Sequence, residues 1–67
     1  MIDIHSSMEE VAEIPGAARL LLEYRIRFYG WSGFFYDTLE QAAQANGVDG
    51  NKLVEELRVL EENSNHS

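Results

Sequence analysis

Few residues in this chain could carry out chemistry. Among its 67 residues there is no cysteine, which excludes a thiol nucleophile, a disulfide bond and a cysteine-ligated zinc or iron–sulfur site. His5 lies near Asp3 and Glu9, but nothing in their spacing makes the three side chains converge on a metal ion. The hydroxyl residues have no paired base for nucleophilic catalysis, and the paired glutamates are sequence neighbours on solvated helix faces. We therefore expect no enzyme activity, no metal site and no cofactor.

Aromatic side chains instead form one cluster in the sequence. All seven lie between Tyr24 and Tyr36, where two glycines and two arginines accompany them. Tryptophan, tyrosine and arginine are the side chains enriched at the energetic centres of protein interfaces. The candidate contact residues, which share this stretch, are Arg25, Arg27, Phe28, Tyr29, Trp31, Phe34, Phe35 and Tyr36.

Three interpretations of this aromatic stretch are open. The first is a protein interface, most simply a homodimer that buries the two stretches against each other. Side chains alternate in an extended segment, and a small helical bundle cannot bury both faces of it, so some rings should be exposed. The second is a site for a small anionic or planar ligand, held between the rings and Arg25 or Arg27. The third is a structural role in which the rings only cover the helical core.

The charge balance excludes several classes of partner. Twelve acidic residues against five basic ones give a net charge of −7 at pH 7. Such a chain repels the phosphate backbone of nucleic acids and an anionic membrane surface. It holds no apolar run of the ~20 residues that span a bilayer, and its first residues lack the basic and apolar regions of a secretory signal. We therefore expect a cytoplasmic protein without nucleic-acid or membrane partners.

The helices that position the aromatic stretch are predicted from caps and apolar spacing. After an extended lead-in over residues 1–6, Ser7 opens a capping box and the first helix starts at Met8. Pro15 ends this helix and lies in the first turn of the second one. The second helix presents an apolar face that consists of Ala17, Leu20, Leu21 and Tyr24, widened by Leu22.

The rest of the chain is predicted as a loop followed by two more helices. The stretch from Phe28 to Asp37 is predicted as a loop, because two closely spaced glycines favour unusual backbone angles over a strand. Thr38 opens a second capping box for a third helix, and Asn46-Gly47 is its C-terminal stop. Asp49 caps a fourth helix, and residues 63–67 form a frayed tail. The predicted fold is all-α, one domain of four short helices with an aromatic, glycine-containing loop between the second and third.

Segments along most of the chain match, in their order and spacing, those of a known family. They are Met8-Glu9-Glu10-Val11, Pro15 with Ala18, Leu21-Leu22-Glu23-Tyr24 with Ile26, Thr38-Leu39-Glu40-Gln41-Ala42-Ala43, Gly47-Val48-Asp49 and Leu53-Val54-Glu55-Glu56-Leu57. The chain thereby resembles the hybrid-cluster-protein-associated redox disulfide domains and, more distantly, the N-terminal domain of iron–sulfur cluster repair proteins. This resemblance implies a small helical fold and, in members that carry a Cys-x-x-Cys pair, redox chemistry.

This chain departs from the family at the position of the cysteine pair. Phe28 and Trp31 stand where those cysteines would be, and Arg25 stands where the family usually has a glycine. Thiol–disulfide exchange requires sulfur nucleophiles, so the redox chemistry does not carry over. We therefore expect a cysteine-free, non-redox relative that acts through binding by its aromatic stretch.

Overall fold

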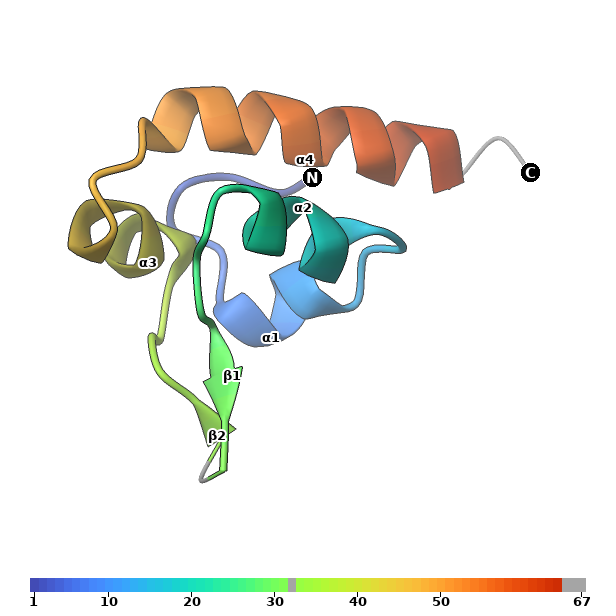
Figure 1. The fold of residues 1–67 in the computed structure, drawn as a ribbon. Coiled ribbons are helices and arrows are strands. Elements are labelled where there is room, and N and C mark those ends of the chain that lie inside the picture. The colour runs from blue at the N-terminus through green and yellow to red at the C-terminus, as the bar shows by residue number, and fades with distance from the viewer. Residues whose placement is uncertain (32, 65–67) are drawn as a thin grey trace.

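The chain forms four helices and one short β-hairpin within residues 1–31 and 33–64, the part that the computed structural model describes (Figure 1). In chain order the elements are α1 (Met8–Ala12), α2 (Ala17–Glu23), β1 (Tyr29–Gly30), β2 (Gly33–Phe34), α3 (Leu39–Ala45) and α4 (Gly50–Ser64). The prediction of a mostly helical chain with four helices is confirmed. The prediction of a purely all-α chain is wrong, because the aromatic stretch pairs with itself as two antiparallel strands.

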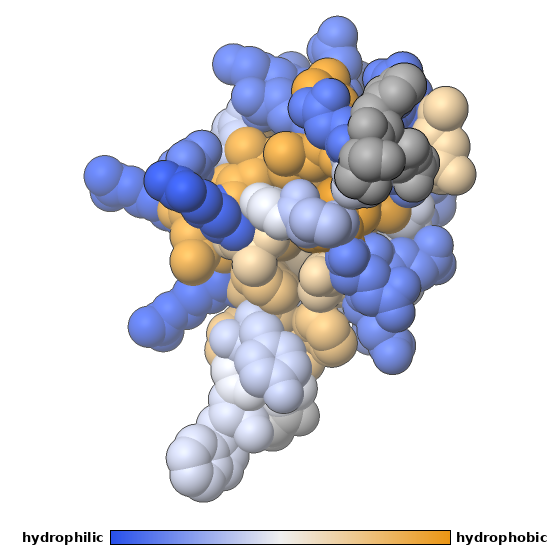
Figure 2. All heavy atoms as spheres, turned by 90° about the vertical axis from the view of Figure 1, so that its right-hand side faces the viewer, coloured by the Kyte–Doolittle hydropathy of each residue, from blue (hydrophilic) through white to orange (hydrophobic). Residues whose placement is uncertain are grey.

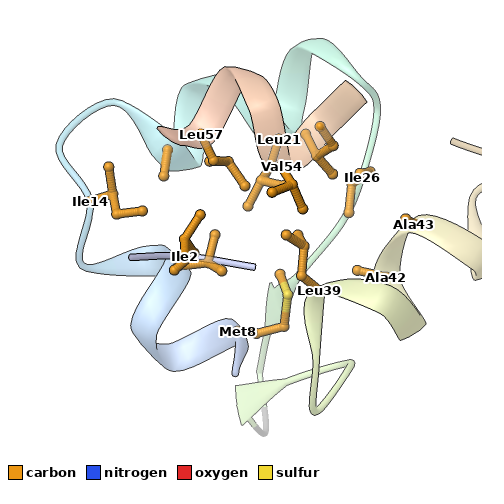
Figure 3. Close-up of a cluster of buried hydrophobic side chains, with 13 residues drawn as sticks. Ile2, Met8, Ile14, Leu21, Ile26, Leu39, Ala42, Ala43, Val54 and Leu57 are labelled. Carbon is orange, nitrogen blue, oxygen red and sulfur yellow. The ribbon is translucent and has the colours of Figure 1, made fainter. Parts of the chain in front are cut away.

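The hydrophobic core lies between α4 and the three shorter helices. Figure 1 shows α4 crossing one side of the molecule, with the hairpin extending from the opposite side. Side chains from every helix and from the N-terminal segment point into the same core (Figure 3). The largest fully buried side chains are Met8, Val11, Leu21, Ile26, Leu39, Leu53 and Leu57. Within the described residues, the core is therefore filled without a fully buried aromatic ring.

Hydrogen bonds join the starts of α1 and α3, because the chain just before each helix accepts an N–H from the first residue of the other. The N–H of Met8 donates to a carbonyl of the chain just before α3, and the N–H of Leu39 donates to a carbonyl just before α1, both at 3.0 Å. Beside these bonds the two cap residues, Ser7 and Thr38, form an antiparallel bridge. The first N–H groups of a helix have no partner within it, so this exchange ties the two helix starts together.

The predicted N-caps are present, although one capping box is only half formed. Thr38 and Gln41 make both hydrogen bonds of the reciprocal box. Ser7 accepts from the N–H of Glu10 at 3.2 Å, but its own hydroxyl donates to the Glu10 carboxylate at 3.3 Å in place of the reciprocal backbone bond. The Asp49 carboxylate caps α4 by accepting a backbone N–H of its first turn at 3.0 Å.

Pro15 lies in a turn between α1 and α2, not in the first turn of α2 as expected from the sequence. Gly16 follows it with φ 87° and ψ −8°, and the N–H of Ala17 donates to the carbonyl of Ile14 at 3.0 Å. These are features of a type II turn, which favours proline as its second residue and glycine as its third. The fixed φ of proline suits both the first turn of a helix and this type II turn. The positive φ of Gly16 is what places Pro15 in the turn.

Three other expectations are corrected by the structure. Leu22 does not widen the buried face of α2, because its side chain is exposed. Helix α4 continues to Ser64, so the frayed tail predicted over 63–67 is wrong for its first two residues, and the other three lie outside the described ranges. The lead-in is not extended throughout, since the N–H of Ser6 closes a turn onto the carbonyl of Asp3 at 3.1 Å.

Helices α2 and α3 end in the same way, on a residue with positive φ. Arg25 follows α2 with φ 61°, and Gly47 follows α3 with φ 66°. In both cases the N–H of the next residue reaches back to a carbonyl of the helix at 2.9 Å, the hydrogen bond of a Schellman motif. Glycine enters this left-handed region without steric cost, whereas a residue with a Cβ is destabilised there by roughly 1–2 kcal/mol. The end of α2 is therefore strained at Arg25.

Substitutions at these two helix ends should change stability in opposite directions. Arg25→Gly relieves the strain, offset in part by the freedom of glycine in the unfolded chain, so the free energy of unfolding should rise by about 0.5–1 kcal/mol. Gly47→Ala should lower it by about 1 kcal/mol, an effect of the backbone alone because a Cβ there would meet nothing within 4 Å. Urea denaturation followed by circular dichroism measures both changes. A free energy of unfolding for Arg25→Gly at or below that of the wild type would contradict this account.

Candidate functional site

The aromatic stretch forms a hairpin whose strands are two residues long. The register places Tyr29 opposite Phe34 and Gly30 opposite Gly33. A further backbone hydrogen bond of 2.9 Å, one pair nearer the helices, extends the pairing toward the body. The predicted loop is therefore wrong in part. Gly33 does adopt an unusual backbone angle, φ 118°, but the residues beside the glycines pair across the hairpin.

The rings of the hairpin are mostly open to solvent. The exposed fraction is 105% at Trp31 and 63% at Tyr29, and Phe34 and Phe35 are also exposed. Phe28 and Tyr36, nearer the helices, are half-buried. Figure 2 shows the hairpin as an arm that extends away from the body of the molecule. The expectation that a small helical bundle leaves some of these rings uncovered is confirmed.

The hairpin rings contact one another. Tyr29 and Phe34 meet edge to face, with ring centroids 5.3 Å apart. Phe28 stacks on Phe34 at 6.4 Å. The ring of Phe35 lies over Gly30, where an added Cβ would overlap it. Aromatic pairs of this kind contribute about 0.5–1.5 kcal/mol each, so the exposed rings form a surface with defined geometry.

The two arginines of the predicted site lie at the base of the hairpin. Arg25 and Arg27 are both exposed, and Arg25 also forms the left-handed turn that ends α2. The eight predicted contact residues thus occupy one continuous segment that includes the whole hairpin. The alternative interpretation, a small anionic or planar ligand held between the rings and these arginines, stays a prediction.

Tyr24, the aromatic residue outside the predicted site, joins α2 to α4. It is half-buried, and its hydroxyl donates a hydrogen bond to the carboxylate of Glu56. This hydrogen bond, and burial after it, raise the pKa of Tyr24 above its ordinary value of 10.0. Folding therefore favours the protonated hydroxyl, which is the form that can donate to Glu56.

A hollow that the sequence does not reveal lies between α2 and α4, and we refer to it as the α2–α4 groove. It has a volume of about 490 Å³ and is lined by Gly16, Leu20, Val59 and Leu60 together with the charged residues Arg19, Glu23 and Glu56. Figure 2 shows hydrophobic residues on the body of the molecule with hydrophilic residues around them. On α4 the apolar side chain of Val59 is 54% exposed, and this exposure marks the groove in the structure.

The sequence predicts neither a metal site nor a membrane segment. Among residues 1–31 and 33–64, histidine, aspartate and glutamate side chains form no group of three or more that could hold a metal ion. His5, Asp3 and Glu9 are exposed, and the Asp3 carboxylate accepts the N–H of His5 at 2.8 Å. Over the same ranges, every helix is too short or too polar to cross a membrane.

Comparisons of this chain with models of protein families, with curated proteins and with solved structures give no match. The resemblance to the redox disulfide domains therefore stays a prediction.

Replacing Tyr24 should remove a contribution to stability that the wild type loses at alkaline pH. Because the pKa of Tyr24 is higher in the folded chain than in the unfolded one, its hydrogen bond stabilises the fold below about pH 10 and is lost as the pH rises through the raised pKa. Between about pH 9 and pH 11, the wild type should lose stability more steeply than Tyr24→Phe. Thermal unfolding followed by circular dichroism measures both slopes. Tyr29→Phe, which removes an exposed hydroxyl, is the control, and equal slopes for the wild type and Tyr24→Phe would contradict the prediction.

Proposed function

We propose that this chain is a non-catalytic interaction domain that binds protein through its aromatic hairpin and, in the simplest case, self-associates. The observation that carries the proposal is the complete exposure of Trp31 between the two strands. Large aromatic side chains bury about 150–250 Å² each, and the burial of apolar surface is the main favourable term in most protein association. A partner surface that covers this ring supplies free energy that the isolated fold does not use.

The geometry of the hairpin supports a role in recognition. The rings of Phe28 and Tyr29 contact that of Phe34, and the turn at Arg25 and the capping box at Thr38 fix the chain on either side of the hairpin. A surface that is ordered before it binds loses less conformational entropy on binding than a flexible one. The hairpin therefore resembles a preformed contact element.

The distribution of charge also favours association through this segment. Residues 28–36 carry no charged side chain, although the chain as a whole has a net charge of −7. Two copies repel each other over most of their surface, because like charges oppose close approach. The hairpin, flanked on one side by Arg25 and Arg27, is where that repulsion is weakest.

The resemblance to the redox disulfide domains bears on this proposal at Arg25. A glycine at this position, as in the family, would suit the left-handed backbone conformation in which Arg25 is found, with φ 61°. This agreement supports a cysteine-free relative in which Phe28 and Trp31 replace a redox pair. The hairpin would then provide a contact surface where other members carry a disulfide.

Light scattering coupled to size-exclusion chromatography tests self-association. The mass of the wild type should exceed 7.6 kDa and rise with concentration. Trp31→Ala should raise the dissociation constant at least about tenfold, because it removes the most exposed ring. Leu22→Ala, which shortens an exposed apolar side chain on α2, is the control and should associate like the wild type. A wild-type mass that stays at 7.6 kDa at every concentration would contradict self-association.

A further inference from the structure

We infer that the surface which receives the hairpin is the α2–α4 groove of a second copy, with Trp31 as the anchoring side chain. This inference rests on the proposed function, since it requires the hairpin to bind another copy of the chain. It replaces the arrangement expected from the sequence, in which two aromatic stretches bury each other, with a contact between two different surfaces.

The shape of the hairpin argues against a contact between two hairpin ends alone. A stable protein interface buries about 800 Å² on each partner. Each strand has only two residues and the hairpin projects as an arm, so two such ends would cover few side chains (Figure 2). An arm that enters a groove is covered on more than one side. The α2–α4 groove, with a volume of about 490 Å³, falls within the range of about 300–1,000 Å³ that is usual for pockets of small ligands.

The groove also matches the chemistry of the anchor. Val59 exposes an aliphatic side chain there, and Leu20 and Leu60 contribute half-buried ones. Tryptophan residues that dominate binding energy fit into apolar pockets from which water is excluded. Trp31 is therefore a side chain that the groove can hold. Because it is fully exposed on its own chain, it can be buried in the groove of a second copy.

Charge distinguishes this arrangement from hairpin against hairpin. The α2–α4 groove is lined by two carboxylates, those of Glu23 and Glu56, against one guanidinium, that of Arg19. At its base the hairpin has Arg25 and Arg27 before the first strand and Asp37 after the second, so this segment has a net positive charge. Contact between two hairpins would bring together segments of the same net charge, whereas contact with the groove brings together segments of opposite net charge, which favours association.

Complementation between two variants tests the arrangement. Trp31→Ala removes the anchor and keeps the groove, whereas Val59→Glu puts a charge into the groove and keeps the anchor. Each variant alone should be monomeric where the wild type associates, with its dissociation constant raised at least about tenfold. An equimolar mixture should form a complex that contains one chain of each kind, because one intact hairpin still meets one intact groove. Native mass spectrometry identifies this complex by its mass.

Two further variants serve as controls. Val59→Lys separates the loss of apolar surface from the addition of negative charge, and it should also be monomeric. Asn51→Glu adds the same charge as Val59→Glu at an exposed position in the first turn of α4, outside the groove lining, and should associate like the wild type. Because Val59 is exposed, circular dichroism should show an unchanged helical content in both of its variants.

The possible results separate the groove contact from the proposed function. Wild-type association in either Val59 variant, with Trp31→Ala monomeric, would overturn the groove contact and leave the hairpin as the binding element. A mixture of Trp31→Ala and Val59→Glu that yields no complex would do the same, as would loss of association in Asn51→Glu. Association of Trp31→Ala at wild-type strength would overturn both proposals.

Discussion

Ile26 and Leu39 are both fully buried, and the chain between them has to leave the core and return to it. Ile26 closes the Schellman motif of α2, with its N–H on a helix carbonyl at 2.9 Å, and Leu39 begins α3 directly after the cap residue Thr38. Because both ends of this segment are held at helix termini, the residues between them pair with each other and extend away from the body (Figure 1). The exposed aromatic hairpin is therefore a consequence of two fixed helix ends.

The rest of the fold is held together by contacts that do not involve the exposed rings. Aliphatic side chains from every helix fill the core (Figure 3). Helices α1 and α3 are too short to persist alone, but their exchanged N–H bonds join them at their starts. The hydrogen bond from Tyr24 to Glu56 ties the end of α2 to α4. Of the hairpin segment, only Phe28 and Tyr36 pack against the core, and the rings of Tyr29, Trp31, Phe34 and Phe35 are exposed.

Features that depend on one or two residues could be predicted from the sequence, whereas features that depend on packing could not. The cap at Thr38 and the helix end at Gly47 follow from the chemistry of those side chains and backbones. Exposure of some rings followed from their number, since a small bundle cannot cover both faces of a segment with six of them. Strands of two residues show no alternation that could be read, and Arg25 has a positive φ with no glycine to mark it. The α2–α4 groove lies between helices distant in sequence, so only the folded chain reveals it.

Fluorescence of Trp31, the only tryptophan in the chain, tests the central claim most directly when it is recorded over a dilution series of the wild type. The claim is that this ring is exposed in the isolated chain and becomes covered by a partner. In dilute protein the emission should lie at long wavelength and be quenched by acrylamide. As the concentration rises, it should shift to shorter wavelength and become protected from the quencher. Emission and quenching that stay the same across the whole series would contradict the account.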